Sequence, residues 1–233
     1  MIRPEEITNW DIVRDALKVR IKNQSSVQKH VSGITEQVED LTLEYVIDMS
    51  GDMTQTAVFQ ENILPTWGVT REEVISIAKQ NVLQEPMLFM PLTQMLFGVE
   101  NKSEDPCPYV VTIGSGSCYG ARPIILPENQ EIISKELGGD FYILPSSVHE
   151  VLVLPADRSV EVNDLRKMVT TINYTEVSSE DWLSDNVYLY DSKAKEIKIA
   201  SGQKKQNKNI SWLQSLKDKE DSEEQEEKDM FRR

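Results

Sequence analysis

The sequence has only two histidines and two cysteines among its 233 residues, which leaves little material for metal or thiol chemistry. Cys107 and Cys118 are too far apart to form a CxxC motif. We therefore expect neither a disulfide framework nor a cysteine-based zinc site. The carboxylates are scattered without the spacing of a metal-binding loop. The sequence thus predicts a protein without a metal ion or another cofactor.

Long apolar runs are also missing. No stretch approaches the ~20 apolar residues that a membrane-spanning helix needs. The first six residues, MIRPEE, lack the basic and then apolar pattern of a secretory signal peptide. We therefore expect a cytoplasmic protein that does not contact the membrane.

Basic residues are too few to balance the acidic ones, and the formal net charge is −14. Residues 201–233 contain eight basic and eight acidic residues, so residues 1–200 carry the whole charge, with 17 basic against 31 acidic residues. This field repels phosphate backbones and disfavours nucleic-acid binding by the body. A basic protein partner and simple solubility both remain open as explanations, and the oligomeric state is not indicated.

Several segments alternate apolar and polar residues or form short apolar runs, and these predict strands. The clearest is a half-buried strand over 41–49, which a Ser50-Gly51-Asp52 turn joins to a returning strand over 54–59. The other expected strands are Tyr109–Ile113, 121–126, Phe141–Leu144, 151–154, and the pair 186–190 and 196–200.

Apolar residues recur every three or four positions in other segments, and these predict helices. In residues 10–22 this face consists of Trp10, Val13, Leu17 and Ile21. Thr70 and Glu73 form a capping box before a helix over Arg71–Leu83. Further helices are expected over 91–97, Pro127–Leu137 and 162–172, whereas 23–37 is assigned to loop or frayed helix.

Helices and strands mix without a strict βα alternation, which predicts an α+β fold with a mainly antiparallel sheet and packed helices. Residues 1–200 are expected to form a single domain. Residues 201–233 form a charged C-terminal tail, expected to be disordered or a solvated helix, with a small apolar island at 211–216. Removal of 203–233 should therefore shift the thermal melt by no more than a few degrees.

The segment between the two apolar runs at Phe141–Leu144 and 151–154 is the candidate functional stretch. It places polar residues in the most apolar part of the chain, where each must be hydrogen-bonded or exposed. We expect the flanking runs to carry His149 into or against the core, where its imidazole can donate from one nitrogen, accept at the other and tie the break to the Leu183-Ser184-Asp185 turn. The candidate surface, with hydrogen-bonding rather than chemical roles, consists of Ser146, Ser147, His149, Glu150, Asn173, Ser184 and Asp185.

An enzyme is the alternative interpretation. His149-Glu150 begins like the zinc motif HExxH, but Val153 occupies its last position. A hydrolase-like enzyme would use His149 as general base, with Ser147 or Cys118 as nucleophile. Cys118 lies in a G-x-C-x-G pattern, yet Pro123 and branched residues follow where a nucleophile elbow needs a helix. An incidental loop cysteine and a structural histidine are the favoured interpretations.

The stretch ILPSSVHE, residues 143–150, resembles the hallmark of an uncharacterised family, a domain of unknown function common in clostridial bacteria and their mobile elements. The resemblance covers about residues 9–200 and implies relatives without a known activity. Family members extend further at the N-terminus, so the resemblance implies a shortened member or a lost start. More distantly, the architecture resembles the YtpQ-like uncharacterised proteins. Other matching pieces, in the family's order, are Trp10-Asp11, Ile77-Ala78-Lys79-Gln80-Asn81, Gly120-Ala121, Met168-Val169 with Asn173, and Leu183-Ser184-Asp185-Asn186-Val187-Tyr188.

Overall fold

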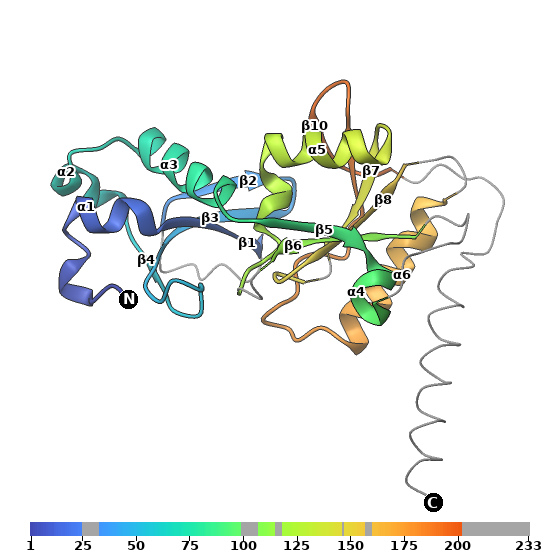
Figure 1. Ribbon diagram of the computed structural model, residues 1–233, viewed down its shortest axis with the longest axis horizontal. Coiled ribbons are helices and arrows are strands. Elements are labelled where there is room, and N and C mark those ends of the chain that lie inside the picture. Colours follow the sequence, from blue (N-terminus) through green and yellow to red (C-terminus); the bar gives the residue numbers. More distant parts are fainter. Residues whose placement is uncertain (25–32, 99–106, 115–117, 146, 157–159, 202–233) are drawn as a thin grey trace, which may run out of the picture.

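The computed structural model describes residues 1–24, 33–98, 107–114, 118–145, 147–156 and 160–201. They form an α+β fold with two antiparallel sheets (Figure 1), which confirms the expected fold class. The expected C-terminal tail lies outside the described residues apart from Ser201. Among the described residues, no helix is both long and apolar enough to cross a membrane.

The first sheet has the order β1-β3-β2, and β4 also pairs with β3. Its central strand β3 is buried on both faces, not half-buried as expected from the alternation. One face carries Leu43 and Tyr45 into the main core, while the other carries Thr42 and Glu44, which are also buried. The strands are β1 (Leu17–Asn23), β2 (Thr35–Val38), β3 (Leu41–Asp48) and β4 (Thr56–Val58).

The second sheet has the order β10-β9-β7-β8-β6-β5. All its pairs are antiparallel, and the expected hairpin partners β9 and β10 are neighbours. The strands are β5 (Met87–Pro91), β6 (Tyr109–Ile113), β7 (Phe141–Leu144), β8 (Val151–Pro155), β9 (Tyr188–Asp191) and β10 (Glu196–Ile199).

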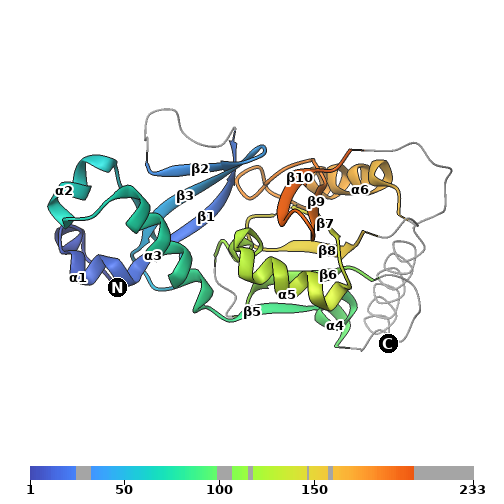
Figure 2. The ribbon, with the colours of Figure 1, turned by 90° about the horizontal axis from the view of Figure 1, so that it is seen from above.

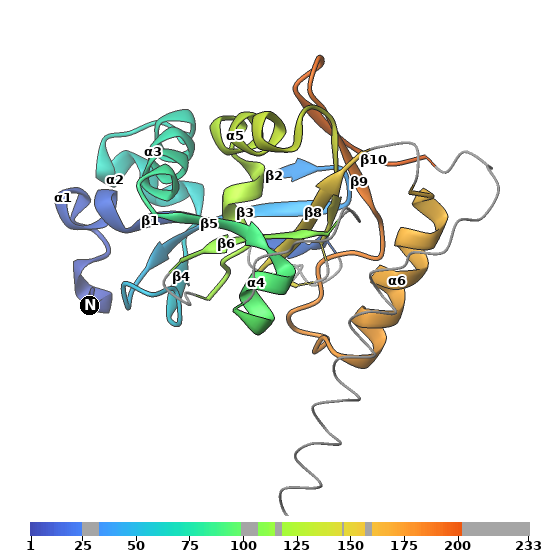
Figure 3. The same ribbon diagram turned by 45° about the vertical axis from the view of Figure 1, so that its right-hand side comes forward.

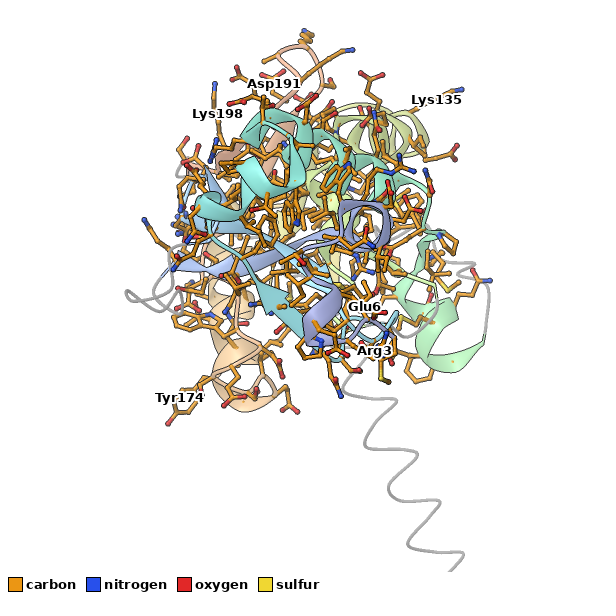
Figure 4. The ribbon with its side chains drawn as sticks, turned by 90° about the vertical axis from the view of Figure 1, so that its left-hand side faces the viewer. Arg3, Glu6, Lys135, Tyr174, Asp191 and Lys198 are labelled. Atoms are coloured by element: carbon orange, nitrogen blue, oxygen red, sulfur yellow. The ribbon has the colours of Figure 1, made fainter. Side chains whose placement is uncertain are left out.

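The helices lie on opposite sides of this second sheet. In Figures 1 and 3, α5 lies above it, whereas α4 and α6 lie below. Seen from above in Figure 2, α4 is beside β5 at one edge and α6 is near β9 and β10 at the other. Tyr174 lies in the last turn of α6, is 91% exposed and points away from the body in Figure 4. The helices are α1 (Trp10–Val13), α2 (Leu64–Trp67), α3 (Arg71–Leu83), α4 (Leu92–Phe97), α5 (Pro127–Leu137) and α6 (Val162–Thr175).

Two helices end and begin as their sequences predict. Thr70 Oγ1 accepts from the backbone N–H of Glu73, and Glu73 Oε2 accepts from that of Thr70, so the capping box fixes the start of α3. Gly138 ends α5 with a φ of 82°, a left-handed conformation that glycine adopts without strain.

The main core joins the two sheets. It includes Leu17 and Tyr45 from the first sheet together with Val111 and Phe141 from the second. A second cluster packs α6 against the β7, β8 and β9 side, with Leu144, Leu154, Leu165 and Val169 among its members.

The prediction of a helix over 10–22 is wrong beyond its first turn. α1 ends at Val13, a short 3₁₀ turn follows, and the chain then becomes strand β1. Leu17 and Ile21 fit one face of a helix. Together with Val19 they also occupy every second position of a strand, with polar residues between them, and in the strand all three lie in the core. Antiparallel pairing with β3 decides between the two patterns.

Three further assignments need correction. The expected strand at 121–126 is a 3₁₀ helix over Arg122–Ile125, in which Pro123 lacks the N–H that a strand ladder needs. Part of the assumed loop at 23–37 is strand β2, paired with the hydrophobic β3. Strand β5 was not expected at all, because its apolar run MLFMP has no alternation.

Candidate functional site

The chain breaks between β7 and β8, and backbone hydrogen bonds tie this break to the segment before β9. The N–H of Val148 donates to the carbonyl of Asp181 at 2.8 Å, and the N–H of Ser184 donates to that of Pro145 at 3.2 Å. Ser147 and Trp182 form an isolated antiparallel bridge. The expected neighbour of the break, the 183–185 turn, is therefore in place, although backbone groups make the connection. Ser146 lies outside the described residues.

The break is also tied on its other side to the loop after β6. Thr112 Oγ1 donates to the carbonyl of His149 at 2.8 Å, and the N–H of Ala121 donates to the carbonyl of Val148 at 3.1 Å. Gly120 passes so close that a Cβ there would collide with the His149 carbonyl oxygen and the Thr112 hydroxyl. The break is thus held on both sides through its own main-chain groups, and the Thr112 hydroxyl is the side-chain donor among their partners.

The His149 imidazole is not carried into the core. Its side chain is 40% exposed, and its Nε2 lies 3.3 Å from Oδ1 of Asp181, which is equally exposed. Asp181 is held in turn by Ser178, whose Oγ donates to Oδ2 at 2.9 Å. Of the two expected positions, inside the core or against it, the structure excludes the first, because the imidazole is partly exposed and faces the carboxylate of Asp181.

Glu150 completes an acidic group beside this histidine. Its carboxylate is half-buried, and this burial raises its pKa above the usual range. The charge of His149 lowers the pKa of Glu150, while that of Asp181 raises it further. Among the described residues Glu150 has no hydrogen bond or ion pair. We call His149, Glu150 and Asp181 the acidic face.

The serine of the break is turned toward the backbone. Ser147 is buried, and its Oγ accepts from the N–H of His149 at 3.0 Å, as in a turn in which a serine caps its own chain. Within the described part of the chain, no hydrogen bond joins Ser147 Oγ to the ring of His149. The aromatic ring next to the imidazole is that of Tyr119, and the centroids of the two rings lie 6.5 Å apart. Tyr119 directly follows Cys118 in the sequence.

The remaining three predicted residues form a second polar group. Asn173 Nδ2 on α6 donates to the carbonyl of Ser184 and to Oδ1 of Asp185, at 3.0 and 2.9 Å. Ser184 Oγ donates to Oδ2 of Asp40 in the first sheet's β2–β3 turn, at 2.8 Å. The hydroxyl of Tyr188 also donates to Asp40, and desolvation, together with that hydrogen bond, raises the pKa of Tyr188. This group joins the two sheets, because Asp40 belongs to the first sheet and Ser184 precedes β9 of the second.

The sequence did not point to the polar network between the sheets. Arg20 forms an ion pair with Glu44, and its Nη1 donates to Tyr119 Oη at 3.3 Å. The guanidinium also lies 5.0 Å from the centroid of the Tyr119 ring. Burial and the neighbouring Arg20 charge lower the pKa of Lys22 in the same strand. The available signal was Glu44 itself, a charge inside the most regular strand pattern of the chain.

The part of the chain that the structure describes contains no group of three or more His, Cys, Asp or Glu side chains arranged to hold a metal ion. The acidic face offers hydrogen-bond acceptors, negative charge and one imidazole, which suit a cationic or hydrogen-bonding ligand.

The fold and this site define an α+β protein with two antiparallel sheets and a polar break between β7 and β8 of the second sheet. A family model described as "Family of unknown function (DUF5688)" matches residues 2–192, and the chain belongs to this family. This confirms that the chain is a member of an uncharacterised family. Neither a search of curated proteins nor a search of solved structures found a match.

Proposed function

We propose that this protein is a non-enzymatic binding protein, whose acidic face receives a Lys or Arg side chain of a protein partner. The observation that carries the proposal is the half-buried carboxylate of Glu150, which lacks an ion pair among the described residues. A carboxylate in that position is penalised by lost hydration, and an incoming cation would offset the penalty.

The neighbours of Glu150 support a cationic group. Asp181 adds a second carboxylate, and the His149 imidazole is already held by Asp181 and exposed enough to meet a ligand. Residues 1–200 carry the net charge of −14, which would steer a basic partner toward the protein and repel nucleic acid. The resemblance to a family common on clostridial mobile elements supports, within the same proposal, an accessory role on a bacterial mobile element.

A peptide array tests the proposal directly. Short peptides with Lys or Arg in varied contexts are screened against the full chain, and the hits are titrated in solution. Glu150→Gln and Asp181→Asn should each weaken binding about tenfold or more, as loss of a charged hydrogen bond does. Glu136→Gln, the same charge change on the exposed side of α5, is the control and should leave binding unchanged. Equal affinity in Glu150→Gln, or no binding to any basic peptide, would overturn the proposal.

A hydrolase-like enzyme is the second candidate, because an imidazole held by a carboxylate is how a general base is oriented. His149 Nε2 and Asp181 Oδ1 have this relationship at 3.3 Å. The nucleophile would be Ser147 or Cys118, although Ser147 Oγ is engaged by the His149 N–H. A panel of activated esters and thioesters tests it: turnover lost in His149→Ala and in either Ser147→Ala or Cys118→Ser supports the enzyme, and no turnover by the unmodified protein rejects it.

A further inference from the structure

An apolar surface lies at the β5 edge of the second sheet. β5 is an edge strand, and all its residues are only partly buried. In α4, which follows it, Met95 and Leu96 are 47% and 56% exposed. Neither of the two core clusters includes the apolar residues Leu88, Met90, Leu92, Met95 and Leu96. We call these five residues the α4 surface.

The α4 surface lies on the same side of the sheet as α6. Met90 is paired with Val110, Val110 with Leu152, and Leu152 with Leu144. Directly paired residues point to one face of a sheet, and Leu144 belongs to the cluster under α6. α6 therefore covers one half of this face, and the α4 surface is its uncovered continuation. Figures 1 and 3 show α4 and α6 on this side, opposite α5.

The chain leaves the described structure on this side as well. Ala200 belongs to the cluster under α6, and its carbonyl accepts from Arg166 Nη2 of that helix at 3.0 Å. Five strand spacings separate β10 from β5, or about 24 Å at ~4.8 Å each. The nine residues 201–209 span up to about 30 Å when extended, so residue 210 can reach the far edge.

The sequence beyond residue 201 contains a matching apolar group. Between residues 202 and 229 the large apolar side chains are Ile210, Trp212, Leu213 and Leu216. Ile210, Leu213 and Leu216 recur every three residues, as the apolar face of a helix does. The preceding residues 202–209 hold three lysines and no acid, so they are attracted by the acidic body that they would cross.

We propose that residues 210–216 dock on the α4 surface and complete the α6 side of the second sheet. A tethered segment has an effective concentration near the millimolar range, which favours it over a second copy of the chain. Docking there would shield an apolar edge strand that is otherwise open to pairing with another molecule. The tail would then be part of the folded body rather than a free appendage.

Hydrogen exchange of the full chain tests this docking. The backbone N–H groups of 210–216 should exchange about tenfold or more slowly than those of a free peptide of the same sequence. Leu96→Glu should abolish the protection, because it places a charge in the docked interface. Ile132→Glu is the matched control: Ile132 is 51% exposed on α5, on the opposite side of the sheet, and its replacement should leave the protection intact.

Each other result counts against the proposal. Exchange of 210–216 at the free-peptide rate would show that the segment is undocked. Protection that survives Leu96→Glu would place the segment elsewhere. Protection that falls on dilution together with a dimer, measured by light scattering, would identify a second copy as the occupant. Leu96 is exposed enough that its substitution leaves the core intact, and unchanged protection of β7 and β8 verifies this.

Discussion

Arg20 and Glu44 lie directly opposite each other in strands β1 and β3, and their side chains form a buried ion pair, with Nη2 2.7 Å from Oε2. Arg20 Nη1 also donates to Thr56 Oγ1 at 2.8 Å. The pair therefore links three strands of the first sheet while reaching Tyr119 of the second half of the chain. Charges so placed are costly to separate, because the one left behind stays buried.

Glu44→Gln should lower the free energy of unfolding by about 3 kcal/mol, since it leaves the Arg20 charge uncompensated. The double variant Arg20→Met/Glu44→Leu should lose less than the sum of the losses in Arg20→Met and Glu44→Leu made singly. Urea melts at neutral pH measure all four variants. The exposed pair Lys195–Glu131 supplies the control, and Glu131→Gln should cost no more than about 1 kcal/mol. Additive losses at Arg20 and Glu44 would show that the pair does not act as a unit.

His149→Ala should change the free energy of unfolding by only about 0.5 kcal/mol. The imidazole is 40% exposed, and the break is held by backbone groups that the substitution leaves in place. Val148→Ala at the neighbouring buried position should cost more, about 1–3 kcal/mol, because it opens a cavity. Denaturant melts compare the two variants. A loss at His149 as large as that at Val148 would mean that the ring itself holds the break.

Gly120→Ala should be among the most damaging single-methyl additions in the chain. The new Cβ would meet the carbonyl oxygen of His149, a backbone atom that can move only with the break itself. We expect a loss of about 3 kcal/mol, at the upper end for overpacking. Gly114→Ala is the control, since its Cβ would lie an ordinary 3.5 Å from the nearest atom, the Pro86 carbonyl oxygen. Equal thermal midpoints for the two variants would contradict the close approach.

Glu150→Gln should raise the stability of the protein at neutral pH. Burial raises the pKa of Glu150 in the folded state, so the folded protein binds this proton more tightly than the unfolded chain does. The charged form is therefore the destabilising one, and its cost is present at neutral pH, declines as the pH falls through the raised pKa, and vanishes below the unfolded pKa of about 4.3.

Thermal melts of Glu150→Gln across pH 3 to 8 would measure this difference. The variant should melt above the unmodified protein at neutral pH, and the two should converge in acid. Glu136→Gln, an exposed carboxylate on α5, should show neither effect. A constant offset at every pH would mean that the gain comes from something other than the charge. Greater stability with weaker peptide binding would be the pattern expected of a binding residue.

Local signals in the sequence were sufficient for most elements of the second sheet. Phe141–Leu144 and the start of β8 are short apolar runs with clear boundaries, and α5 begins at a proline and ends at a glycine. The first sheet was harder, because β1 carries two compatible periodicities. Its pairing partner β3 begins 24 positions after the start of β1, and only that long-range pairing excludes a helix.

The candidate site was predictable only where local sequence signals define it. The polar break and its neighbour at 183–185 follow from where strands stop. The turning of His149 toward Asp181, and the placement of Tyr119 against Arg20, depend on how three distant segments meet. No local pattern encodes those meetings, although the charge of Glu44 within an apolar strand marked one of them.

Two side-chain contacts between the first sheet and the segment before β9 also determine when the chain can finish folding. Asn23 Nδ2 donates to the carbonyl of Leu183, 160 residues later in the chain. The Asp40 carboxylate accepts from the hydroxyl of Ser184, 144 residues later. Such high contact order slows folding, because a long loop must close before these bonds form. During synthesis, the Asn23 amide and the Asp40 carboxylate therefore stay hydrated until the segment around Leu183 and Ser184 leaves the ribosome. A chain stalled before residue 183 would leave both polar groups in water, and its folding would depend on chaperones or on rapid completion.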